Sequence, residues 1–174
     1  MSLLVVSYPD LPPHAAEWLR NLRVRFTGLS HSALDPHFTL VFPLAEVSQA
    51  DLVEHVRTQL TGRPRIRFVL RSSLLVKDDA SDLWYVLLVP DEGFGDLVKL
   101  HDTLYTGMLA PALRLDIPYI PHITVGYAAD LWLCKRVVDQ LNAENLMVSG
   151  VIDSLHVVRK EEGAALTVAQ LPLS

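Results

Sequence analysis

The sequence predicts an α+β fold in which one structural unit occurs twice. Stretches with strand-like and helix-like apolar periodicity alternate along all 174 residues. A five-residue pattern, proline–histidine–apolar–threonine–apolar, occurs at 36–40 and again at 121–125, with its two histidines 85 residues apart. Each copy is surrounded by the same order of strand, helix, patterned strand, helix and strand. We therefore expect a single domain made of two pseudo-symmetric halves, at about 1–80 and 81–174.

Proline and serine delimit the elements of the first half. Pro12 and Pro13 suit the first turn of a helix, Ser48 is a favoured N-cap, and Pro9 and Pro43 end strands. With the apolar periodicity, these signals predict the following elements: a strand at 3–8, a helix from 13 to about 28, a strand at 37–42, a helix from 48 to 61, and a strand at 66–76 that is broken at 72–73.

The second half contains the same kinds of element. Apolar residues three and four positions apart mark its helices, and alternating or continuous apolar runs mark its strands. The predicted elements are a strand at 84–89, a helix across 94–108, a strand at 122–127, a helix across 134–141, and two closing strands at 146–159 and 164–171.

Composition excludes several classes of protein. A formal charge of −5 argues against a duplex DNA-binding surface, which is normally basic. Cys134 is the only cysteine, so neither an intrachain disulfide nor a cysteine metal cluster can form. The N-terminus lacks a basic flank and a cleavage site, and no apolar run is long enough to span a bilayer. We expect a cytoplasmic, monomeric protein with no membrane partner.

The repeated pattern has a direct structural meaning if each copy is a strand. Alternate side chains of a strand point to opposite faces, so His37 and Thr39 would share one face while Phe38 and Leu40 enter the core. The second copy, at 121–125, would present its histidine and threonine in the same way. A single copy is most often structural, whereas two copies in a duplicated unit favour a functional role.

Two imidazoles and two hydroxyls on rigid backbone suit acid–base chemistry at phosphorus. Imidazole has an ordinary pKa of about 6.5, so His37 and His122 can act as acid and base in one step. Thr39 and Thr124 can donate hydrogen bonds to phosphoryl oxygens. The best-matched reaction is in-line substitution, in which one histidine deprotonates water and the other protonates the departing sugar oxygen. It requires both motifs to meet at one cleft, since any other packing leaves two unrelated histidines.

Competing chemistries find less support in the sequence. There is no Gly-x-Ser-x-Gly elbow, no glycine-rich phosphate loop and no dinucleotide fingerprint. Neither motif histidine has a second metal ligand at helical spacing, and no His or Cys cluster supplies a third. We therefore expect neither a cofactor nor a metal ion.

The paired His-x-Thr-x motifs at 37–40 and 122–125 resemble those of the 2H phosphoesterase superfamily, in its 2′-5′ RNA ligase and cyclic phosphodiesterase branch. The resemblance extends over nearly the whole chain. It implies a bilobal α+β fold, with antiparallel sheets lining a central cleft and helices on the outside. It also implies metal-independent hydrolysis of the 2′,3′-cyclic phosphate of a nucleotide or RNA end.

The resemblance also suggests roles for individual residues. It makes His37 the expected general acid and His122 the general base, although a pseudo-twofold axis makes the two roles nearly interchangeable. The RNA ligase-like members often carry an arginine shortly after each motif, where this chain has Val41 and Tyr127. That departure argues against ligase activity and long RNA substrates.

Four further residues are candidates for substrate binding. Tyr127, Tyr119 and Phe42 lie close to the motifs and could stack on a base, with plain packing as the alternative. Arg67 belongs to a run of alternating arginines that could form a phosphate-attracting wall or an exposed charged strand face. His101 is expected to be a core residue.

These observations favour an enzyme, a phosphoric diester hydrolase that opens a 2′,3′-cyclic phosphate. A noncatalytic module that binds nucleotides or RNA ends in the same cleft remains an alternative. A third possibility is a 2H enzyme that acts on another cyclic phosphate or on a 2′-5′ linked oligonucleotide.

Overall fold

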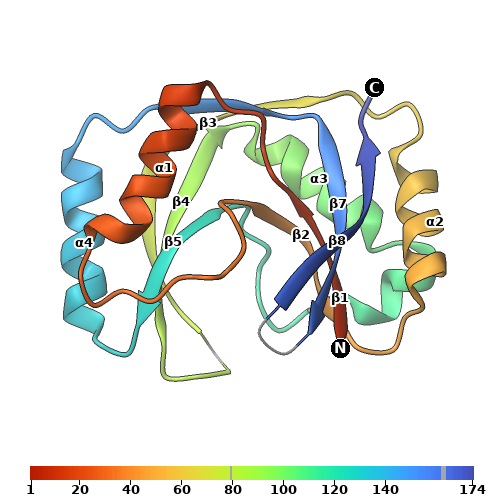
Figure 1. Cartoon of the computed structure of the whole chain (residues 1–174), viewed down its shortest axis with the longest axis horizontal. Helices are drawn as coiled ribbons and strands as arrows, with labels where there is room; N and C mark the ends of the chain where they lie inside the picture. The colour runs from red at the N-terminus through yellow and green to blue at the C-terminus, as the bar shows by residue number, and fades with distance from the viewer. Residues whose placement is uncertain (79, 162–163) are drawn as a thin grey trace.

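The computed structural model describes residues 1–78, 80–161 and 164–174. Its strands form one antiparallel sheet of eight, in the order β6-β3-β4-β5-β2-β1-β7-β8 (Figure 1). The elements are β1 Ser2–Ser7, α1 Pro13–Arg25, β2 Phe38–Leu44, α2 Gln49–Leu60, β3 Ile66–Lys77, β4 Trp84–Glu92, α3 Phe94–Leu104, the short 3-10 helix η1 Gly107–Ala112, β5 Ile123–Ala128, α4 Leu131–Ala143, β6 Val148–Ile152, β7 Ser154–Glu161 and β8 Ala164–Pro172. The predicted α+β class is confirmed, with one curled sheet in place of separate sheets.

Three helices each pack on one half of the sheet, and α3 packs across both. Helices α1 and α4 pack against the half that contains β3, β4 and β5, and α2 packs on β8, whereas α3 packs on β2 and also on β3 and β4 (Figure 1). Each half of the sheet draws strands from both halves of the sequence, because β3 joins β4 and β5 while β7 and β8 join β1 and β2. The half with β3, β4, β5 and β6 is therefore one continuous segment, enclosed in the sequence by the strands of the other half.

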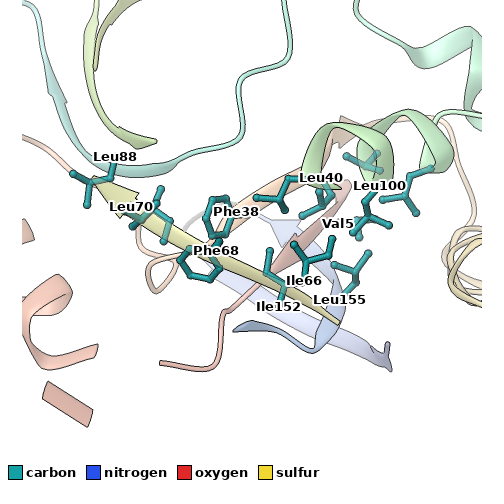
Figure 2. Close-up of a cluster of buried hydrophobic side chains, with 14 of the residues drawn as sticks. Val5, Phe38, Leu40, Ile66, Phe68, Leu70, Leu88, Leu100, Ile152 and Leu155 are labelled. Atoms are coloured by element: carbon teal, nitrogen blue, oxygen red, sulfur yellow. The ribbon is translucent and has the colours of Figure 1, made fainter. Parts of the chain in front are cut away.

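The main hydrophobic core lies between the sheet and its helices. Phe38 of β2 meets Phe68 of β3 edge to face, with ring centroids 5.0 Å apart, and Leu40 lies beside them (Figure 2). The side chains of Phe38 and Leu40 are fully buried, as are those of Ile123 and Val125 in β5. This confirms that the apolar positions of both motifs enter the core, which leaves the opposite face of the central strands for the polar positions.

Two predicted strands differ from those observed. Strand β3 runs unbroken through Ser73, because a register shift after Leu70 is accommodated rather than ending the strand. The Asn142 amide donates to the Ser73 carbonyl and accepts from the Ser73 N–H, at 2.9 and 2.7 Å. The predicted strand at 146–159 is two strands, β6 and β7, which pair with β3 and β1 in different halves of the sheet.

Candidate active site

The two halves of the sheet meet at a single residue pair, Phe38 of β2 and Ile123 of β5. If that antiparallel register is continued by one residue in each direction, His37 is set across from Thr124 and Thr39 across from His122. Opposite residues point to the same face, so this register groups the four polar side chains in a two-by-two block. Direct neighbours in such a block have Cβ atoms about 5 Å apart, and the two histidines lie on the diagonal, about 7 Å apart.

Both imidazoles are held by the same backbone contact. The Nδ1 atom of His37 lies 2.7 Å from the carbonyl oxygen of Asp35, and that of His122 lies 2.6 Å from the carbonyl oxygen of Ile120. A carbonyl oxygen can only accept, so each Nδ1 carries the proton and donates it. In the neutral ring, this leaves the Nε2 lone pair free to accept a proton from a bound molecule.

Burial keeps both imidazoles neutral near pH 7. It lowers the pKa of His37 to about 4, and the charges of Arg23, His122 and Lys160 act in the same direction against the backbone hydrogen bond. Burial also lowers the pKa of His122. Each histidine is therefore poised as a proton acceptor, and a bound anion would be needed to stabilise its protonated form.

A bulge follows each motif at the same position. In β2 one residue is skipped between Thr39 and Val41 in the pairing with β1, and in β5 one residue is skipped between Thr124 and Gly126 in the pairing with β4. The extra residue reverses the alternation of side chains beyond it. As a result, the aromatic residues five positions after each histidine return to the face that carries the threonines. They are Phe42 and Tyr127.

Two adjoining cavities lie on this face. The first, of about 450 Å³, is lined by His37, Thr39 and Thr124. The second, of about 370 Å³, contains His122 and a largely apolar wall. Phe42 and Tyr85 line both cavities and so form their common boundary. His37 and His122 thus line two cavities that adjoin at these aromatic residues.

Of the predicted substrate-binding residues, Phe42 and Tyr127 line the His37 cavity. Tyr127 also packs against Tyr85, with ring centroids 5.1 Å apart. Arg67 does not join them. It lines a separate cavity with Asp10 and residues of β6, because β3 lies next to β6 and is separated from β5 by β4.

Tyr119 lies behind the motif rather than in front of it, which corrects the expectation that it offers a face to a base. Its ring is stacked on the His101 ring, with the ring centroids 3.7 Å apart, and its hydroxyl donates to the carbonyl oxygen of Thr39 at 2.9 Å. His101 Nδ1 lies 2.9 Å from the carbonyl oxygen of Leu40, and the Tyr105 hydroxyl accepts from the N–H of Phe42. These three side chains satisfy backbone groups around the β2 bulge, and His101 is buried as predicted.

The loop before β2 is fixed from two directions. Arg23 of α1 donates to the carbonyl oxygen of Leu34 at 2.5 Å. Ser30 pairs with Tyr127 through both backbone groups, at 2.8 and 2.9 Å. This pairing needs Gly126, since a Cβ atom there would lie 2.8 Å from the carbonyl oxygen of Ser30. The loop therefore delivers His37 from a defined position beside β5.

Several residues of the site were not singled out in the sequence. Tyr85 enters because β4 pairs with β5, and Tyr8 because β1 pairs with β2; the Tyr8 ring meets His37 edge-on at 6.0 Å. Lys160 lines the His37 cavity from β7. Tyr85 could have been predicted from the duplicated unit. It lies in the strand that precedes the second motif, and such a strand is a candidate to pair with the motif strand. No such signal pointed to Lys160.

Among the described residues, no group of three or more His, Cys, Asp or Glu side chains is placed to hold a metal ion. Over that same part of the chain, no helix combines the length and apolarity that crossing a membrane requires.

The site and sheet together define a two-histidine protein of the 2H phosphoesterase type. A family model described as the 2′-5′ RNA ligase superfamily matches residues 11–164. The chain belongs to the 2′-5′ RNA ligase superfamily, and the resemblance seen in the sequence is confirmed. A relative from Geobacillus sp. strain WCH70, named as a candidate phosphoesterase, is 26% identical over 142 residues, covering 80% of this chain and 79% of its own.

Solved structures share the fold over nearly all their length. A Thermus thermophilus protein, TT0787, superposes with a TM-score of 0.67 at 17% identity, covering 99% of this chain and 98% of its own. Escherichia coli LigT in complex with 3′-AMP gives a TM-score of 0.64 at 17% identity with the same coverage. Kluyveromyces marxianus Usb1 with uridine monophosphate gives 0.58 at 12% identity, again with 99% and 98% coverage. At these identities the likeness concerns the fold.

Proposed function

We propose that this protein is a phosphodiesterase that hydrolyses the 2′,3′-cyclic phosphate of a nucleotide or RNA end without a metal ion. The observation that carries the proposal is the antiparallel pairing of Phe38 with Ile123, a register that sets each motif histidine opposite the other motif's threonine in a two-by-two block. Two proton-transfer groups on a diagonal, with two hydroxyls on the other diagonal, can surround one phosphoryl group. The nucleotides bound by LigT and Usb1 support a ligand of this class.

The reaction assigned to this block is a single in-line displacement. Nε2 of His122 takes a proton from water as the water oxygen forms a bond to phosphorus. The bond from phosphorus to one ribose oxygen breaks, and Nε2 of protonated His37 gives that oxygen its proton. The Thr39 and Thr124 hydroxyls donate to the nonbridging oxygens, where negative charge increases. The product is a phosphate monoester, and the two histidines exchange protonation states.

The low pKa of free His37 is compatible with a role as acid. The substrate phosphate carries a negative charge, and an anion within about 4–6 Å of an imidazole favours its protonated form. Substrate binding therefore raises the pKa of His37 from about 4 and supplies the proton that the departing oxygen needs. The acid would thus be formed mainly in the complex.

The test is hydrolysis of the four nucleoside 2′,3′-cyclic monophosphates in the presence of EDTA. Loss of one acid–base group typically costs about 10²- to 10⁴-fold in rate, so His37→Ala and His122→Ala should each lose that much in kcat. Arg67→Gln is the matched control, because Arg67 lines a separate cavity and should leave kcat and KM unchanged.

Thermal melts establish that each variant is folded before its activity is compared. Activity that survives in both histidine variants contradicts the mechanism, and activity that disappears with EDTA contradicts metal independence. Binding of 3′-AMP with no turnover of any cyclic nucleotide identifies the noncatalytic module instead. Phosphorus NMR of the products separates cyclic phosphate opening from cleavage of a 2′-5′ linkage.

A further inference from the structure

We propose that Lys160 forms a second phosphate-binding subsite in the His37 cavity, and that the substrate is a nucleotide carrying another phosphate besides the reacting one. The inference rests on the proposed function and narrows its substrate class. It favours a terminal nucleotide with a phosphate on its 5′ side over an isolated nucleoside cyclic phosphate.

Strand pairing puts Lys160 on the same face as the reacting block. Thr39 of β2 lies opposite Val6 of β1, and residues of even number in β1 share that face. Ser2, two alternations further along β1, lies opposite Lys160 of β7. Leu4, between these positions, lines the cavity with both Thr39 and Lys160, so the cavity is continuous from the reacting block to the lysine.

The Lys160 charge is available to a ligand. Its side chain is exposed, and within residues 1–78, 80–161 and 164–174 it forms no ion pair. The neighbouring acid, Glu161, is already paired with Arg159 at 3.0 Å. Lys160 is also the one lysine or arginine among the described residues that line this cavity. A second phosphate placed here would therefore meet an uncompensated positive charge.

The lysine also acts electrostatically at the reacting block. Its charge contributes to the lowering of the His37 pKa, which places it within electrostatic range of that imidazole. A ligand that neutralises Lys160 removes this contribution and eases protonation of His37. A substrate with two phosphates would thus gain favourable electrostatic interactions at both Lys160 and His37.

Lys99 of α3 offers a matched control. It lines a separate cavity with Arg63 and Leu100 and pairs with Asp96 at 3.6 Å. Lys99→Gln therefore removes the same charge from outside the two cavities that contain the motif histidines. A general effect of net charge would appear equally in Lys99→Gln and Lys160→Gln.

The experiment compares adenosine 3′-monophosphate with adenosine 3′,5′-bisphosphate by calorimetry, which requires no turnover. We expect the wild-type protein and Lys99→Gln to bind the bisphosphate about ten-fold more tightly, as one charge-assisted hydrogen bond would give. In Lys160→Gln the two ligands should bind equally. The salt dependence for the bisphosphate should also become shallower by about 0.7 in the log–log slope.

The same three proteins are then assayed on adenosine 2′,3′-cyclic phosphate with and without a 5′-phosphate. Lys160→Gln should lower kcat/KM about ten-fold for the 5′-phosphorylated substrate only. Equal losses on both substrates, or equal binding of the two ligands by the wild-type protein, overturn the subsite. Absence of turnover with a preserved difference in binding overturns the proposed reaction and leaves the subsite standing.

Discussion

At the scale of single residues, the buried imidazole of His37 couples folding to pH. Its pKa is about 4 in the folded protein and about 6.5 in an unfolded chain, so the unfolded chain binds the extra proton between these values. Its contribution to stability is therefore complete above about pH 6.5, declines as pH falls, and levels off below about pH 4. The loss amounts to about 2 kcal/mol at pH 5.

We expect His37→Asn to remove this dependence. Urea unfolding at pH 7 and pH 5 measures it: the wild-type protein should lose about 2 kcal/mol more than the variant between the two values. His14→Asn serves as the control, since His14 lies on a different face of the molecule, in α1. Parallel pH profiles for the wild-type protein and His37→Asn would contradict the assignment.

The motif side chains show what the sequence could predict at this scale. Period-two alternation was enough to place His37 and Thr39 opposite Phe38 and Leu40, because it is a local property of any strand. The inward stacking of Tyr119 on His101 could not be predicted, since it joins a loop to a helix 18 residues earlier in the chain. For Arg67, the alternative of an exposed charged strand face agrees with its exposed position in a separate cavity.

At the scale of elements, the bulges in β2 and β5 are the features that the sequence did not reveal. An extra residue leaves no compositional mark at Leu40 or Val125, both of which are ordinary core residues. Without the bulges, strict alternation would send Phe42 and Tyr127 to the buried face. Their position in the cavity therefore depends on a pairing irregularity that is visible only once neighbouring strands are known.

Gly126, at the bulge of β5, gives a test at this scale. Gly126→Ala would place a Cβ atom 2.8 Å from the Ser30 carbonyl oxygen and push away the loop that carries His37. We expect a loss of about 1–3 kcal/mol in stability together with a drop in kcat. Urea unfolding and steady-state kinetics measure the two effects.

Gly95 provides the matched control. It lies inside α3, and a Cβ atom there has nothing within 4 Å. Gly95→Ala should therefore stabilise the protein by up to about 1 kcal/mol, through helix propensity alone. Glycine-to-alanine substitution should thus lower the stability at Gly126 and raise it at Gly95. A loss of stability at both positions would refute the steric explanation for Gly126.

At the scale of the whole molecule, one backbone pair joins the two halves of the sheet, and α3 packs across both. β2 and β5 pair only through Phe38 and Ile123 in the described part of the chain, and Phe38 also packs on Phe68. The half made of β3, β4, β5 and β6 comes from one continuous segment, whereas the half made of β1, β2, β7 and β8 combines strands from both ends of the chain. The duplicated pattern was readable in the sequence, whereas this exchange was not, because it depends on long-range pairing.

Phe38 should accordingly be critical for global stability. Phe38→Ala should cost about 3–5 kcal/mol, as is typical for a fully buried aromatic residue. Phe94→Ala is the control, because Phe94 is 37% exposed and should cost far less. Urea denaturation followed by both fluorescence and circular dichroism should show one coincident transition; two separate transitions would contradict the prediction of a single domain.

The matching bulges after Thr39 and Thr124 have a consequence for the direction of bond cleavage in the proposed reaction. A centre built from two equivalent strands looks nearly the same after a half-turn, and so do the paired ester oxygens of a cyclic phosphate. The two-by-two block of histidines and threonines therefore cannot by itself favour a 2′ over a 3′ product. That preference has to be set by residues that differ between the two equivalent positions, such as Phe42 and Tyr127. Exchanging these two side chains would change which ester bond is cleaved and would leave the histidines and threonines intact.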